Sequence, residues 1–123
     1  MNERGRQGED CAARFLERKG YRILARNYRT RFGEIDLIAQ QGEFLAFVEV
    51  KTRTENGWGR PAEAVSAAKQ RRILLAAQEY LQLVACEWQP RFDVVEIITA
   101  RGVPFLPRQI HHLEDAFCLP QGW

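Results

Sequence analysis

The stretch GEIDLIAQQGEFLAFVEVKT, residues 33–52, joins two apolar runs through a polar turn that contains Gly42. Two apolar runs with a short glycine-containing turn between them predict a β-hairpin. Because side chains alternate between the two faces of a strand, Glu49 and Lys51 share one face, at the end of five consecutive apolar residues. The first strand divides in the same way into two sets, Ile35, Leu37 and Ala39 on one face and Glu34, Asp36 and Ile38 on the other.

Two carboxylates are expected to meet in this hairpin. Folding back at the turn brings Asp36 near Glu49, and ionised carboxylates a few Å apart repel, so either one takes up a proton or both bind a cation. Hard oxygen ligands, with no cysteine or histidine close by in sequence, favour magnesium or manganese over zinc. Lys51 would then point at whatever the metal holds. The alternative is a surface hairpin with a cross-strand ion pair.

The spacing of these residues resembles a known signature. Asp36, twelve intervening residues and then Glu49-Val50-Lys51 resemble the Asp…Glu-x-Lys motif of the PD-(D/E)XK nuclease superfamily. Further segments strengthen the likeness, namely Gly8-Glu9, residues 33–39, residues 47–53 and Phe92-Asp93-Val94-Val95. From about residue 8 to residue 117 the chain is thus similar to the small bacterial YraN-like family, whose members are similar to archaeal Holliday-junction resolvases.

This resemblance implies a fold and an activity. The fold is α/β and restriction-endonuclease-like, a central mixed β-sheet flanked by α-helices, in a single domain over residues 1–123. The activity is that of a magnesium- or manganese-dependent endonuclease on DNA, branched or structured DNA included. Asp36, Glu49 and the backbone carbonyl of Val50 would hold the metal. Lys51 would orient the attacking water or stabilise charge on the phosphate, and a homodimer is implied because two cuts need two sites.

Charge is unevenly distributed along the 123 residues, whose formal net charge is +2. Residues 32–50 carry four acidic and no basic residues, whereas residues 1–31 carry nine Lys and Arg against four Asp and Glu, and residues 51–72 carry six against two. An acidic centre between basic segments suits an enzyme that acts on a polyanion, since acids hold the cation and bases neutralise phosphates. The alternative is a set of ordinary solvated helix faces.

The chain before the hairpin predicts a helix over residues 7–19 and a strand over residues 21–29. Glu9 near the start of this helix would complement the helix dipole. The resemblance instead places Glu9 among the catalytic residues, where it would complete the acidic shell together with Glu34. The helix is indicated by an apolar stripe at helical spacing, formed by Cys11, Ala12, Phe15 and Leu16.

Basic residues next to the hairpin are candidates for nucleic-acid binding, because Arg is well suited to bidentate contacts with phosphate. Arg29 and Arg31 precede the hairpin, and Arg53 and Arg60 belong to the loop over residues 52–61 that leaves it. Solvated side chains are the competing interpretation. Trp58 in the same loop would either stack on an unpaired base or cover the core.

A second helix is expected over residues 67–85, with Ser66 as its amino-terminal cap and a core-facing apolar stripe. The resemblance adds Lys69 and Gln70, in its first turns, to the candidate nucleic-acid-binding residues. A strand over residues 92–99 follows, in which Asp93 is assigned a structural role.

The carboxyl-terminal part is expected to be irregular, because Pro104 and Pro107 interrupt it. His111 and His112 are adjacent, so their side chains diverge on a strand or on a helix. We therefore assign them no catalytic role.

Composition excludes several classes of protein. Hydrophobic residues make up 46% and charged residues 28%, which is typical of a globular chain rather than a disordered one. Neither a membrane span nor a signal peptide is apparent, which predicts a cytoplasmic protein without a membrane partner. The three cysteines are odd in number and lack metal spacing, so reduced thiols are expected.

Two other functions compete with a nuclease. A non-catalytic nucleic-acid-binding module could assist a partner in DNA repair, recombination or uptake. The joint presence of Asp36, Glu49 and Lys51 argues against this, because a binder gains little from acids that face phosphates. An interaction scaffold without a nucleic-acid role would show no salt-sensitive affinity for DNA.

Overall fold

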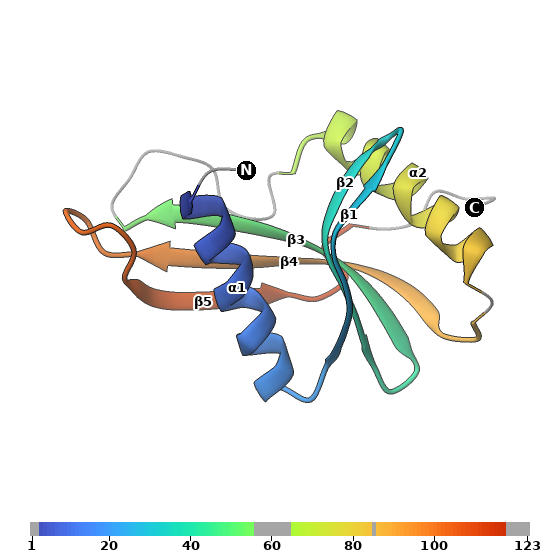
Figure 1. Cartoon of the computed structure of the whole chain (residues 1–123), viewed down its shortest axis with the longest axis horizontal. Helices are drawn as coiled ribbons and strands as arrows, with labels where there is room; N and C mark the ends of the chain where they lie inside the picture. Colours follow the sequence, from blue (N-terminus) through green and yellow to red (C-terminus); the bar gives the residue numbers. More distant parts are fainter. Residues whose placement is uncertain (1–2, 56–64, 85, 118–123) are drawn as a thin grey trace.

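The computed structural model describes residues 3–55, 65–84 and 86–117, which form an α/β fold (Figure 1). Its strands make a five-stranded sheet in the order β1-β2-β3-β4-β5. β3 and β4 are parallel and the other neighbouring pairs are antiparallel, so the sheet is mixed. No helix among the described residues is long and apolar enough to cross a membrane. The elements in chain order are α1 (Glu3–Arg18), β1 (Arg22–Thr30), β2 (Gly33–Gln41), β3 (Phe44–Thr54), α2 (Ala67–Leu83), β4 (Gln89–Thr99) and β5 (Pro107–Leu113).

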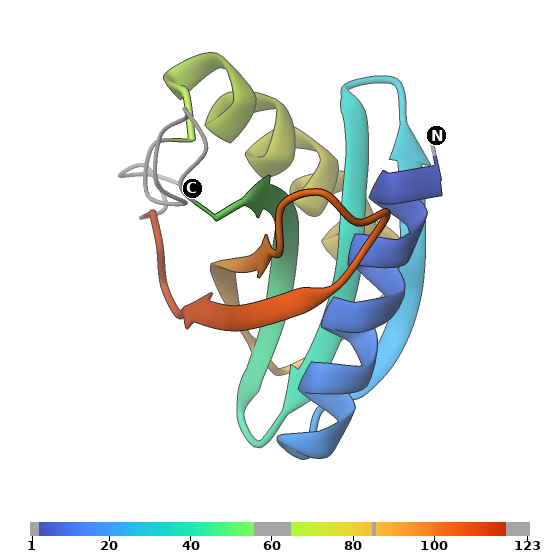
Figure 2. The same cartoon turned by 90° about the vertical axis from the view of Figure 1, so that its left-hand side faces the viewer.

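The two helices cover opposite faces of the sheet (Figures 1 and 2). α1 packs on a cluster that includes Leu37 and Val48, whereas α2 packs on a cluster that includes Phe47 and Phe92. Val48 and Phe47 are neighbours on β3 and point to different sides, as the strand alternation predicts. The apolar stripe predicted for the first helix is confirmed, since its Leu16 is fully buried in the α1 cluster.

The sheet divides at Asp36. β2 pairs with β3 only from Leu37 onward, where Leu37 lies opposite Val48. Before that residue β2 pairs with β1 alone, and the β1–β2 hairpin leans away from β3 (Figure 1). The prediction that Ile35 shares a face with Leu37 and Ala39 is wrong, because β2 parts from β3 between Ile35 and Leu37, and Ile35 packs in the α2 cluster.

Several predicted boundaries are also wrong. α1 begins at Glu3 instead of residue 7, β4 begins at Gln89 instead of residue 92, and α2 ends at Leu83 instead of residue 85. The expected irregular end contains a fifth strand, β5, at the edge of the sheet. Pro107 does not prevent this, because it is the first residue of an edge strand, where the missing N–H is tolerated.

Gly8 sets the distance between α1 and β3. A Cβ atom built on Gly8 would lie 2.4 Å from Oγ1 of Thr52, closer than side-chain atoms pack. The absence of a side chain therefore lets α1 lie against β3, and it brings the next residue, Glu9, to the place where the sheet divides.

Asp93 has the structural role that we predicted. Its fully buried carboxylate accepts two hydrogen bonds from Arg91, at 2.9 and 2.8 Å, and one from the backbone N–H of Asp115, and it lies 2.8 Å from Nε2 of His112. Burial acts to raise the pKa of Asp93, but the hydrogen bonds from His112 and Arg91 hold this pKa below its ordinary value. This buried network joins β4 to β5 and to the turn that follows.

Candidate active site

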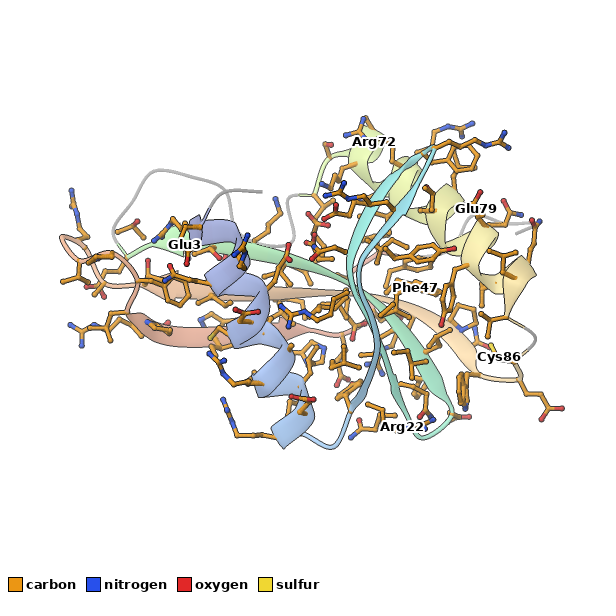
Figure 3. All side chains as sticks on the ribbon, in the orientation of Figure 1. Glu3, Arg22, Phe47, Arg72, Glu79 and Cys86 are labelled. Carbon is orange, nitrogen blue, oxygen red and sulfur yellow. The ribbon has the colours of Figure 1, made fainter. Side chains whose placement is uncertain are left out.

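A cavity of about 310 Å³ opens where β2 leaves β3. Figure 3 shows side-chain oxygen atoms gathered in this region, between α1, β3 and the β1–β2 hairpin. Asp36 and Glu49 both border the cavity, as the predicted hairpin requires. Its lining comes from α1 (Arg4, Gly5 and Glu9), β2 (Asp36) and β3 (Glu49, Val50 and Thr52).

Asp36 borders the cavity at the point where β2 parts from β3. Its Oδ2 atom accepts a hydrogen bond from the backbone N–H of Val50 at 2.8 Å, so the carboxylate occupies the gap between the diverging strands. Burial, followed by the negative charge of Glu49, raises the pKa of Asp36 to about 8, although the Val50 hydrogen bond acts in the opposite direction. Without a bound cation, Asp36 therefore keeps a proton at neutral pH.

Glu9 approaches Asp36 from α1, and Glu34 lies two residues before Asp36 on β2. One carboxylate oxygen from each of the three residues lies within 4.8 Å of the other two. Asn27 on β1 connects the two glutamates, because its Nδ2 donates to Oε1 of Glu9 at 2.7 Å and to Oε1 of Glu34 at 2.9 Å. The helix-dipole role considered for Glu9 is wrong, since α1 begins at Glu3 and the dipole effect falls off within the first turn.

Glu49 is buried and forms an ion pair with Lys69 of α2, at 3.2 Å between Oε1 and Nζ. Lys69 was predicted to contact nucleic acid, and the structure places its ammonium group on a carboxylate of the cavity. Lys51 is half-buried and is not among the residues that line the cavity. Its role toward a metal-bound group stays a prediction.

Other predicted nucleic-acid-binding residues have partners within the protein. Nε of Arg29 lies 3.2 Å from Oε2 of Glu34, and Nε of Arg53 lies 2.8 Å from Oε2 of the buried Glu96. Both arginines thus neutralise carboxylates of the chain itself, and their contacts with nucleic acid remain predictions.

The remaining candidates that the structure describes, Gln70 and Arg31, do not line the cavity. Gln70 donates from its side chain to the backbone carbonyl of Val65, and the Arg31 guanidinium lies 4.9 Å from the ring centroid of Phe32. Arg60 and Trp58 lie outside the described residues. Of the described candidates, Lys69 alone is shown in contact with a carboxylate that lines the cavity, and Gln70 follows it in the first turn of α2.

Sequence reasoning missed Asn27 and Arg4. Asn27 has a φ angle of 51°, in the left-handed region that asparagine tolerates better than most residues. The only signal in the sequence was an asparagine inside a predicted strand, where this residue type is depleted. Arg4 precedes the predicted start of the first helix, yet it borders the cavity and donates to Oγ1 of Thr99 at 2.7 Å.

The donors around the cavity suit a hard divalent cation. Three acidic side chains line the cavity, Glu9, Asp36 and Glu49, and no cysteine or histidine is among the described residues that line it. Glu34 adds a carboxylate oxygen within 4.8 Å of those of Glu9 and Asp36. Magnesium and manganese prefer such oxygen ligands. The pKa of Asp36 is raised by burial and then by the nearby negative charges of Glu49 and Glu9. A cation bound among these carboxylates would offset that repulsion.

Comparison with known proteins identifies the family. The model described as "Uncharacterised protein family UPF0102" matches residues 8–97. A UPF0102 protein of Rhodococcus opacus (strain B4) is 52% identical over 115 residues, which cover 92% of this chain and 94% of the relative. A UPF0102 protein of Chlorobium chlorochromatii (strain CaD3) is 49% identical over 121 residues, 97% of this chain and 94% of the relative. The chain therefore belongs to the UPF0102 family.

Proposed function

We propose that this protein is a metal-dependent endonuclease that hydrolyses phosphodiester bonds in DNA. The observation that carries the proposal is the convergence of Glu9, Glu34 and Asp36, from α1 and β2, within 4.8 Å of one another beside a cavity that Glu49 also lines. A mixed five-stranded sheet flanked by two helices is compatible with the restriction-endonuclease-like fold, which forms part of the proposal.

The residues of the cavity fit a magnesium or manganese ion. Asp36, Glu49 and the backbone carbonyl of Val50 would hold it, and Glu9 would add negative charge beside it. When bound, such an ion polarises a phosphate and lowers the pKa of water. Positive charge at this position would also keep Asp36 ionised at neutral pH.

Lysines next to the acidic residues would act on the phosphate. Lys51 lies two residues beyond Glu49 on β3 and would orient water or stabilise charge that develops on phosphate oxygens. Lys69 lies 3.2 Å from Glu49, and an ion at the carboxylates would free its ammonium group for the substrate.

Exposed arginines at the start of α2 and at the turn of the β1–β2 hairpin support a polyanionic substrate. Arg71 and Arg72 lie on the first turns of α2, and Arg72, labelled in Figure 3, packs beside Gly33 at the turn of the β1–β2 hairpin, which also contains Arg31. Among the described residues, no carboxylate pairs with any of these three arginines. Their charges are therefore available to flanking phosphates, a contact that would make DNA affinity salt-sensitive.

The test is cleavage of labelled single-stranded, duplex, flap and four-way-junction DNA in magnesium and in manganese. We expect the wild-type protein to cut at least one substrate and Asp36→Asn and Lys51→Ala to abolish cutting. Asp10→Asn is the matched control, because Asp10 is an exposed acidic residue on α1 that pairs with Arg26 and does not line the cavity.

Failure of the wild-type protein to cut any of these substrates in either metal would refute the endonuclease proposal. Salt-sensitive DNA binding that persists in EDTA would then favour the non-catalytic binding module. A protein that neither cuts nor binds DNA would favour an interaction scaffold.

A further inference from the structure

Asn27 connects the carboxylates of two different elements. Glu9 lies on α1 and Glu34 lies on β2, and the Nδ2 atom of Asn27 on β1 donates to both, at 2.7 and 2.9 Å. A primary amide has two hydrogens on its nitrogen, so both are used here. Each bond has a carboxylate oxygen as its acceptor, so one amide nitrogen holds two acidic side chains side by side.

Few residue types could donate to both glutamates from position 27. The backbone has a φ angle of 51°, which glycine, asparagine and aspartate adopt with less strain than other residues. Glycine has no side chain to donate, and an aspartate carboxylate would repel Glu9 and Glu34. Asparagine alone among these three combines the left-handed backbone with two neutral donor hydrogens.

The remaining oxygens of the two glutamates are oriented as a result. Oε2 of Glu34 lies 3.2 Å from Nε of Arg29, so both oxygens of Glu34 have partners. Glu9 is 6% exposed, and its Oε1 atom accepts the hydrogen bond from Asn27. Asn27 thus fixes a buried carboxylate at the cavity that Asp36 also borders.

We infer that Asn27 is a positioning residue of the acidic site, which holds the carboxylates of Glu9 and Glu34 beside Asp36, where their negative charge strengthens the binding of a divalent cation. This inference rests on the proposed metal-dependent function. Asn27 does not touch the cation in this arrangement, but outer partners of this kind change metal affinity about 10- to 100-fold.

The experiment measures Mn²⁺ binding by titration calorimetry for the wild-type protein, Asn27→Gly and Asp115→Gly. Glycine removes the amide and relaxes the left-handed backbone, so Asn27→Gly is expected to fold. Asp115→Gly is the matched control, because Asp115 is the other described non-glycine residue with positive φ, at 54°, and its side chain lies outside the cavity. We expect the Mn²⁺ dissociation constant to rise about tenfold or more in Asn27→Gly and to stay unchanged in Asp115→Gly.

A double-mutant cycle with Glu34→Gln separates positioning from a general loss of structure. If Asn27 acts through the glutamates, Asn27→Gly weakens Mn²⁺ binding by a smaller factor in the Glu34→Gln background than in the wild type. Wild-type affinity in a folded Asn27→Gly protein, or equal factors in both backgrounds, would overturn the inference and leave the proposed function intact. Absence of Mn²⁺ binding by the wild-type protein would overturn both.

Discussion

Replacing Asp36 with asparagine should stabilise the protein at neutral and alkaline pH in the absence of metal. Asparagine keeps an oxygen that can accept the hydrogen bond from the backbone N–H of Val50, which Asp36 accepts at 2.8 Å. Asparagine cannot ionise, so the substitution avoids the buried negative charge that burial and Glu49 make unfavourable at position 36. The effect on stability therefore comes from the charge of Asp36 rather than from a lost contact.

The sign and the size follow from the raised pKa of Asp36. Its pKa is about 8 in the folded protein, against an ordinary value of 3.8. In the unfolded chain Asp36 ionises near pH 4, whereas in the fold it stays protonated, so wild-type stability falls as pH rises from about 4 to about 8. This difference corresponds to an upper limit of about 6 kcal/mol. Because Asp36 retains some contact with solvent, we expect Asp36→Asn to gain about 1–4 kcal/mol over this range.

The assay is urea unfolding of both proteins in EDTA at several pH values between 4 and 9. The free energy of unfolding of Asp36→Asn should match that of the wild type near pH 4 and exceed it increasingly up to about pH 8. Magnesium should reverse the order at pH 8, because an ion that binds only the folded wild type stabilises it by mass action.

The matched control is Asp10→Asn, which removes an exposed carboxylate paired with Arg26 and should show no such gain. A constant difference between Asp36→Asn and the wild type across the whole pH range would refute the assignment of a buried, proton-holding Asp36.

Three further predictions concern packing, the buried network and the lysine beside the site. Gly8→Ala places a Cβ atom 2.4 Å from Oγ1 of Thr52 and should lower the free energy of unfolding by about 1–2 kcal/mol in urea titrations. The double variant Gly8→Ala/Thr52→Ala should recover much of this loss, because it removes the atom that clashes. Asp93→Ala leaves the Arg91 guanidinium buried without its carboxylate and should cost about 3–5 kcal/mol, measured by thermal unfolding. Because the pKa of Asp93 is lowered in the fold, its stabilising effect should be lost as pH falls below about 4. Lys69→Met removes the ammonium that competes for Glu49 and should tighten Mn²⁺ binding by about 2- to 10-fold in calorimetry, while weakening DNA binding in filter assays.

The hairpin and the two amphipathic helices could be predicted because their signals are local. Apolar residues at helical spacing led to the buried stripe of α1, and strand alternation led to the separate faces of Val48 and Phe47 on β3. The same alternation and the turn at Gly42 predicted that Asp36 and Glu49 lie near each other, and both residues line one cavity. Local periodicity failed for β5, because an edge strand that begins with proline depends on a pairing partner far away in the sequence.

The sequence by itself thus determined the order of most elements, the apolar faces of the helices and the meeting of Asp36 with Glu49. Only the tertiary structure decided that the sheet divides at Asp36, that Asn27 joins Glu9 to Glu34, and that Lys69 pairs with Glu49. The hydrogen bonds of Asn27 and the ion pair of Lys69 join separate elements, so they depend on how closely α1 and α2 approach the strands. Helix and strand periods fix which way a side chain points within its own element, whereas the distance between two elements is set by packing, as it is where Gly8 meets Thr52.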